Sequence, residues 1–244
     1  MTAPDAIIQT HALVKAFGLQ PVLRRLDLSI NRGDYVALLS PNGGGKSTLL
    51  RLLAGLSKPT SGRITVGGWE LPAEAAAVRA QIGMVSHKVL LYENLSAREN
   101  LRFFARLYNL PRAEAEARIE TLLKRVGLAR RQHDLVRTYS RGMQQRLSIA
   151  RALLHYPHVL LFDEPYTGLD QDASRALDEL LAEAHDEGHT IVMATHDLNR
   201  AATLASRVVI LARGAVGFDR PSAELTPASL AAAYSEVTGM VTAR

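Results

Sequence analysis

Cysteine is absent from the 244-residue sequence, which excludes disulfides, a thiol nucleophile and a thiolate metal site and fits a cytosolic protein. Long apolar runs are absent too, because no stretch approaches the roughly 18 uninterrupted apolar residues of a membrane-spanning helix. The N-terminus has no basic stretch followed by an apolar run, so no secretory signal is expected. Any work at a membrane therefore needs a partner.

What is present suits a globular chain of one or two domains, since 47% of the residues are hydrophobic. The net charge of +5 is unevenly placed: residues 98–141 hold eleven Lys/Arg and five Asp/Glu, a local charge of +6. Such a basic region can face nucleic acid, an anionic membrane surface or an acidic partner. It can equally be a solvated arginine-rich surface.

The hydrophobic pattern changes period along the chain. Apolar spacing predicts strands at 6–14, 22–30, 35–39, 63–66, 81–85, 158–162, 190–194 and 208–211. Helical spacing predicts helices at 47–53, 142–155, 171–187, 198–205 and 227–237, and two more within 97–126, the second starting at Pro111. The first two strands indicate an antiparallel β-layer, and the later alternation indicates a mainly parallel sheet covered on both faces.

A glycine-rich run between the strand 35–39 and the helix 47–53 is the most informative motif. Three glycines without side chains let backbone N–H groups point at phosphate oxygens, and the helix start adds its positive dipole end. Lys46 supplies a charge for the outer phosphates, and the Ser47 hydroxyl can ligate Mg²⁺. The residues expected to contact a nucleotide here are Ser40, Pro41, Asn42, Gly43, Gly44, Gly45, Lys46, Ser47 and Thr48.

The first position of this loop departs from the strict phosphate-loop pattern, because Ser40 stands where that pattern has glycine. A residue with a β-carbon is tolerable there only if its φ stays negative.

Acidic side chains follow the apolar strand 158–162. Asp163 and Glu164 come at its carboxyl end, where an open α/β sheet positions its ligands. Asp163 is expected to hold the magnesium ion and Glu164 to polarise the water that attacks the γ-phosphate. Ordinary helix caps are the plainer interpretation of such acids, but Pro165 follows at once.

His196 follows the next apolar strand, 190–194, in the same way. We expect it to donate a hydrogen bond to the γ-phosphate or to orient the water, although a lone histidine is more often structural. Ser140 precedes the helix 142–155 and is a plausible N-cap. The same helix start is also an anion site that a second subunit can offer to a bound nucleotide.

These motifs, taken in order, resemble the nucleotide-binding subunit of ABC transporters over nearly the whole chain. Tyr139–Arg146 resembles the family's signature sequence, with Arg141 and Met143 in place of a glycine and a glutamine. Tyr166–Asp170 resembles the loop that touches the partner subunit, and His196 resembles the switch histidine. Phe17 matches the aromatic residue that stacks on adenine, although it can also be a hydrophobic plug in the β-layer.

The resemblance implies an α/β fold: a P-loop NTPase core with a mainly parallel sheet, an N-terminal antiparallel β-layer and an inserted α-helical subdomain. One ATPase domain would span 1–244, with the core at 1–86 and 142–244 and the helical insertion at 87–141. It implies ATP and Mg²⁺ as ligands. It also implies a homodimer or paired ATPase subunit, in which Ser140, Arg141, Gly142 and Asp170 of one copy close on the ATP bound to the other.

The resemblance further implies integral membrane permease subunits as partners, and a peripheral location on the cytoplasmic face of the inner membrane. His87 stands where the family has a glutamine that reaches the magnesium ion and the transporter interface. Imidazole is a poorer magnesium ligand than an amide oxygen, so we expect His87 to contact the ion only through water. We also expect the rate of ATP hydrolysis to fall as the pH drops through the titration range of His87.

A finer resemblance covers Val85–Leu101 and Phe103–Tyr108, which are similar to small bacterial exporter ATPases, most closely those assigned to haem export in cytochrome c maturation. Leu90, Leu91 and Tyr92 are candidate anchors for the membrane subunit. The alternative is a soluble ATP-gated clamp on nucleic acid or ribosomes, favoured by the +6 region. The chain lacks a long coiled-coil insertion and a second cassette, so no direct nucleic-acid partner is expected. A small-molecule kinase is a third possibility, but no acceptor pocket is suggested.

Overall fold

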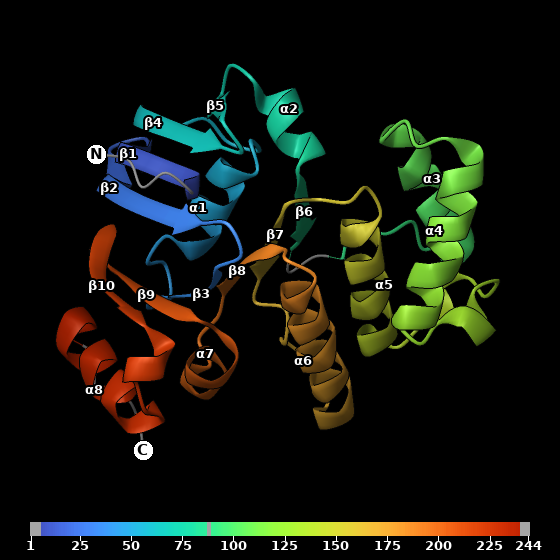
Figure 1. Cartoon of the computed structure of the whole chain (residues 1–244). Helices are drawn as coiled ribbons and strands as arrows, with labels where there is room; N and C mark the ends of the chain where they lie inside the picture. The colour runs from blue at the N-terminus through green and yellow to red at the C-terminus, as the bar shows by residue number, and fades with distance from the viewer. Residues whose placement is uncertain (1–5, 87–88, 240–244) are drawn as a thin grey trace.

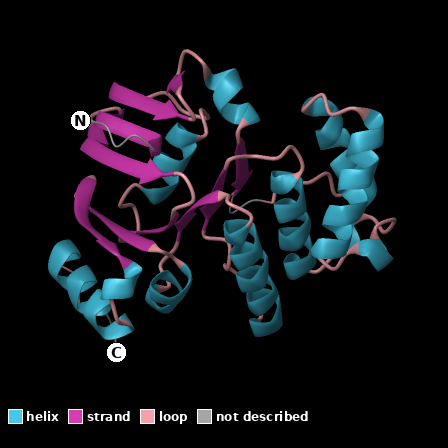
Figure 2. Cartoon of the chain, in the orientation of Figure 1, coloured by secondary structure: helices cyan, strands magenta, loops and turns pink. Residues whose placement is uncertain are grey.

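The computed structural model describes residues 6–86 and 89–239. Two β-sheets and the helices around them occupy one side of the molecule, and α3 and α4 lie beyond α5, away from both sheets (Figure 1). Figure 2 shows the same division by secondary structure, with the strands gathered apart from this helical part. Within the described ranges, no helix is long and apolar enough to cross a bilayer.

The N-terminal sheet is antiparallel, as predicted, and has the strand order β2-β1-β4-β5. Its strands are β1 (Ala6–Phe17), β2 (Gln20–Asn31), β4 (Ser61–Val66) and β5 (Trp69–Leu71). The predicted strands at 6–14, 22–30 and 63–66 fall within the first three of these, while β5 was not predicted because it is only three residues long.

The central sheet has the order β10-β9-β3-β8-β7-β6 and is parallel except for β10, which pairs antiparallel with β9. Its strands are β3 (Tyr35–Leu39), β6 (Ile82–Val85), β7 (Val159–Asp163), β8 (Thr190–Ala194), β9 (Arg207–Ala212) and β10 (Ala215–Pro221). β3, β7 and β8 are buried along their whole length, which is why they read as continuous apolar runs. The edge strand β10 was not predicted, since it is polar and only partly buried.

The helices match the predicted ones closely, apart from the short α2. They are α1 (Lys46–Leu53), α2 (Ala75–Ala80), α3 (Ala97–Leu107), α4 (Arg112–Arg125), α5 (Arg141–Leu153), α6 (Gln171–Asp186), α7 (Leu198–Leu204) and α8 (Pro227–Thr238). Short 3₁₀ helices lie at Ala129–Arg131, Val136–Thr138 and Ser222–Glu224. A capping box starts α3: Ser96 accepts from the Glu99 amide, and the Glu99 carboxylate accepts from the Ser96 amide.

Alternate residues of the central sheet face two separate apolar cores. Leu161 and Val192 point toward α1 and the N-terminal sheet, while Phe162 and Met193 point toward the layer formed by α5 and α6. The second core continues into the helical part through buried residues of α4 such as Ile119. The central sheet is therefore covered on both faces, as its composition predicts, and its carboxyl ends are left to carry polar residues.

His155, just after α5, makes the stability of this fold depend on pH. Its ring stacks on Tyr108 with centroids 3.7 Å apart, and its Nε2 lies 3.0 Å from the Ile82 carbonyl oxygen. Burial lowers the pKa of His155 from 6.5 to about 4, against the opposing effect of the Ile82 hydrogen bond. The unfolded chain therefore binds a proton between these pH values that the folded chain does not.

We expect the free energy of unfolding to be highest above about pH 6.5 and to fall by about 1–3 kcal/mol toward pH 4 on account of this ring. Urea unfolding of wild type and His155→Gln across this range measures the effect, and the variant should show the shallower dependence. His133→Gln is the control, because His133 is exposed. Equal slopes for wild type and His155→Gln would contradict the assignment.

Candidate functional site

The glycine-rich loop connects β3 to α1, as the motif requires. Gly43 and Gly45 have φ values of 76° and 102°, in the region that favours glycine. Gly45 also lies close to β2, because a β-carbon added there would be 2.7 Å from Leu23 Cδ2. Gly45 is the N-cap of α1, so the helix begins at Lys46, one residue earlier than predicted.

Ser40, which stands where the strict phosphate-loop pattern has glycine, shows no backbone strain. It is absent from the described non-glycine residues with positive φ, which is the condition that the sequence analysis set. Its side chain is buried against Gly44, where an added β-carbon would lie 2.6 Å from the Ser40 hydroxyl. The serine thus fills the space that Gly44 leaves.

Lys46 is held over the loop at its first helical turn. Its Nζ donates to the Ser40 carbonyl oxygen at 2.8 Å and lies 3.8 Å from Glu164 Oε1. The side chain is 8% exposed. Burial lowers the pKa of Lys46, and the carboxylates of Glu164 and Asp163 oppose that shift.

Ser47 and Asp163, the two described residues predicted to hold magnesium, are in direct contact. The Ser47 hydroxyl donates to Asp163 Oδ1 at 2.9 Å. Asp163 is the last residue of β7 and is buried, so the register of the central sheet brings its carboxylate to the start of α1. The third predicted ligand, His87, lies outside the described residues.

Glu164 joins the predicted catalytic residues into one cluster. Its Oε2 lies 2.8 Å from His196 Nδ1, and its Oε1 faces Lys46. Its backbone has φ 51°, an uncommon conformation for a residue with a side chain, and its N–H donates to the Ala194 carbonyl oxygen. Strain at this position indicates that the surroundings fix the carboxylate in place.

A cavity of about 360 Å³ lies over this cluster. Val22, Glu164 and all nine residues of the predicted loop line it: Ser40, Pro41, Asn42, Gly43, Gly44, Gly45, Lys46, Ser47 and Thr48. Phe17 is not among the lining residues. It lies at the end of β1 with 58% of its surface exposed, and Lys15 Nζ stands 4.9 Å from its ring centroid. An exposed ring is not a plug in the β-layer.

The remaining predicted contacts form a second group at the starts of α5 and α6. Ser140 is the N-cap of α5 and accepts from the Met143 amide, so the N-cap interpretation is confirmed. Asp170 caps α6 in the same way, accepting from the Ala173 amide at 2.8 Å. The two starts touch, because a β-carbon on Gly142 would lie 2.9 Å from Ala173 Cβ.

Arg141 strengthens the contact between these two segments. A β-carbon on Gly168, which has φ 75°, would lie 2.7 Å from Arg141 Nε. The guanidinium therefore covers the loop at residues 166–170. None of Ser140, Arg141, Gly142 or Asp170 lines the cavity over the glycine-rich loop.

Arg151 is a positioning residue that the sequence analysis missed. It is 8% exposed, and its guanidinium donates to the carbonyl oxygens of Met84 and Leu90 at 2.8 and 2.9 Å. Ser148 donates to the Val89 carbonyl oxygen from the same helix. The available signal was a charged residue on the otherwise apolar side of the predicted helix 142–155. Together these bonds tie both flanks of residues 87–88 to α5.

Comparison with known proteins gives a consistent result. A family model described as ABC transporter matches residues 23–167. The linearmycin resistance ATP-binding protein LnrL of Bacillus subtilis is 35% identical over 85% of this chain and 67% of its own length. The Nod factor export ATP-binding protein I of Cupriavidus pinatubonensis is 38% identical over 87% and 65%. The sulfate/thiosulfate import ATP-binding protein CysA of Synechococcus elongatus is 40% identical over 86% and 61%.

Solved structures confirm the fold class. An ATP-binding subunit of an ABC transporter superposes with a TM-score of 0.85 at 32% identity, covering 95% of this chain and 99% of that one. A dimeric ATP-binding cassette in a post-hydrolysis state, bound to ADP and phosphate, superposes with a TM-score of 0.79 at 29% identity, covering 88% and 98%. The alternative of a clamp on nucleic acid or ribosomes is not favoured by these relatives.

Proposed function

The chain belongs to the ABC transporter family as an ATP-binding and ATP-hydrolysing subunit, and from this we propose that two copies close on a pair of ATP molecules. One observation carries the proposal. The expected ATP contacts fall into two separate groups, one in the cavity over the glycine-rich loop and one at the starts of α5 and α6. A single copy therefore offers each nucleotide only half of its contacts.

The loop half binds the phosphates. Residues 43–48 line the cavity, and the positive end of the α1 dipole adds to the ammonium group of Lys46. Because Lys46 is buried, its charge acts in a less polar medium than water. Phe17, exposed at the end of β1, is proposed to stack on the adenine.

The half contributed by the second copy closes over the outer phosphates. Ser140 and Gly142 would meet the γ-phosphate at the start of α5, and Asp170 would lie across the interface. Arg141 adds a positive charge where the family has glycine. Its position over Gly168 holds the guanidinium beside this half of the site.

The donor set fits a magnesium ion, because the Ser47 hydroxyl and the Asp163 carboxylate are hard oxygen ligands that lie 2.9 Å apart at the phosphate loop. When bound there, magnesium would neutralise charge on the β- and γ-phosphates. Glu164 would accept a proton from the attacking water, and His196 would hold the Glu164 carboxylate through their 2.8 Å contact.

Integral membrane permease subunits are the proposed partners, which would place the chain on the cytoplasmic face of the inner membrane. A cavity of about 190 Å³, lined by Leu90, Phe104, Tyr108 and Arg151 among others, offers them a docking place. Leu90 and Tyr92 are 60% and 50% exposed, whereas Leu91 packs against the core and is the weaker anchor. The resistance and Nod factor relatives support export, and haem remains the narrower proposal for cargo.

The dimer is tested with the Glu164→Gln variant, which should bind ATP without hydrolysing it. Sedimentation with ATP and magnesium is expected to show a dimer, and sedimentation without nucleotide a monomer. A second variant that adds Ser140→Arg should stay monomeric while still binding ATP, because Ser140 does not line the phosphate cavity. A Glu164→Gln protein that remains monomeric with ATP, even beside its membrane partner, would refute the proposal.

A further inference from the structure

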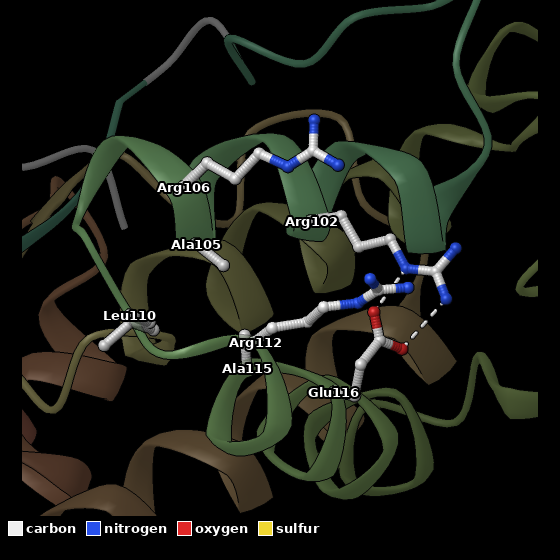
Figure 3. Close-up of a pocket in the computed structure, with 7 residues that line it drawn as sticks. All are labelled: Arg102, Ala105, Arg106, Leu110, Arg112, Ala115 and Glu116. Carbon is white, nitrogen blue, oxygen red and sulfur yellow. Dashed lines mark hydrogen bonds and ion pairs between the residues drawn. The ribbon is translucent and has the colours of Figure 1, made fainter.

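An arginine-lined pocket lies between α3 and α4, in the part of the chain that carries the +6 charge. Its volume is about 290 Å³, and its lining residues are Arg102, Ala105, Arg106, Leu110, Arg112, Ala115 and Glu116. Figure 3 shows the side chains of Arg102 and Arg106 leaving α3, and that of Arg112 leaving the start of α4. None of these residues belongs to the two groups that would contact ATP.

Glu116, the acidic residue among those lining the pocket, is paired with Arg98 and Arg102 and not with Arg106 or Arg112. Glu116 accepts from Arg102 at 2.5 and 2.9 Å and from Arg98 at 2.6 Å. The hydrogen bonds from Arg102 hold the pKa of Glu116 at about 2, so it stays ionised. One carboxylate thus shares its charge between two guanidiniums.

Arg106 and Arg112 are left without a counter-charge. Among residues 6–86 and 89–239, neither makes an ion pair within 4 Å. Both side chains are exposed, and they reach the pocket from different helices. Arg112 is also the first residue of α4, where the helix dipole favours an anion over a cation. An anion placed between the two would give each guanidinium a counter-charge and would interact favourably with the start of α4.

We propose that this pocket binds the phosphate of an anionic phospholipid head group at the membrane surface. Guanidinium groups match phosphate oxygens in bidentate geometry, and two of them on opposite walls can share one phosphate. Ala105, Leu110 and Ala115 provide an apolar floor for the organic part of the head group.

The choice of a lipid as the occupant rests on the proposed function, because the proposed permease partners would hold the chain beside a negatively charged membrane. Arginines near an anionic bilayer gain attraction that falls off within a Debye length. An acidic segment of a permease is a different occupant with the same charge. The volume of about 290 Å³ favours a single phosphate group over an extended peptide.

The test is flotation of the full chain with vesicles of phosphatidylcholine alone or with added phosphatidylglycerol. Wild type should bind only the anionic vesicles, and Arg106→Gln with Arg112→Gln should bind them about 10- to 30-fold more weakly. The matched control is Arg130→Gln with Arg137→Gln, which removes the same charge from exposed arginines that do not line the pocket. The control should lose less than about threefold in affinity. Equal losses in both variants would overturn the pocket in favour of general charge attraction.

Soluble glycerol phosphate distinguishes a membrane lipid from a free phosphate compound as the occupant of the pocket. Competition with the anionic vesicles supports the proposal, whereas binding of glycerol phosphate by a protein that ignores all vesicles overturns the lipid assignment. ATPase rates in the same samples keep the two proposals apart. A wild type that hydrolyses ATP but never floats refutes only the lipid site, because Arg106 and Arg112 lie outside the proposed catalytic machinery.

Discussion

Replacing Glu164 by glutamine is expected to lower the rate of ATP hydrolysis by about two to four orders of magnitude, the range for loss of a general base. Glutamine keeps the shape of the side chain but cannot accept the proton of the attacking water. It also removes the charge that faces Lys46 at 3.8 Å and His196 at 2.8 Å. Phosphate release at saturating ATP and magnesium measures the rate.

ATP binding should survive this change, because Glu164 contributes one side chain to a cavity otherwise formed by the loop and Val22. Equilibrium binding of a fluorescent ATP analogue provides that comparison. Glu236→Gln is the matched control, since it makes the same substitution at an exposed position on α8 and should leave turnover unchanged. Turnover of Glu164→Gln within about threefold of wild type, well short of the loss expected on removing a general base, would exclude Glu164 as the base.

Truncating Phe162 to alanine is expected to cost about 3–5 kcal/mol of folding free energy, a large part of the roughly 5–15 kcal/mol that a typical domain has. The ring is 0% exposed in β7, and the paired positions on the neighbouring strands are Met193 and Val85. Urea unfolding gives the difference directly.

Loss of the Phe162 ring should also disturb the predicted catalytic residues, because Asp163 and Glu164 follow it immediately. We therefore expect Phe162→Ala to weaken ATP hydrolysis along with stability, whereas Phe162→Leu should lose less than about 1.5 kcal/mol and remain active. If Phe162→Ala unfolds at the same urea concentration as Phe162→Leu, the packing described for β7 is wrong.

The sequence predicts the parts of this fold that follow from a local pattern. Continuous apolar runs predicted β3, β7 and β8, and the glycines at residues 43–45 predicted the position of the cavity that is proposed to hold the phosphates. The positions of Asp163 and Glu164 were also predictable, since the carboxyl ends of parallel strands meet at one edge of the sheet.

What the sequence could not supply depends on contacts between distant residues. The edge strand β10 has no apolar run of its own, and it is held by pairing with β9. Gly83 resembles any other glycine in a strand, yet a β-carbon there would lie 2.3 Å from the Ala152 carbonyl oxygen of α5. The positive φ of Glu164 follows from the bonds around it and leaves no trace in the local sequence.

The hydrogen bonds from Arg151 to the carbonyl oxygens of Met84 and Leu90 would couple the movement of these two residues to that of α5. Arg151 sits near one end of α5 and Ser140 caps the other, a separation of roughly 16 Å along a stiff rod. A displacement of the segments around Met84 and Leu90 by a permease would be transmitted along α5 to Ser140, the residue proposed to contact the ATP bound to the neighbouring copy. Binding of cargo at the permease and closure of the ATP site would then be coupled through the movement of α5.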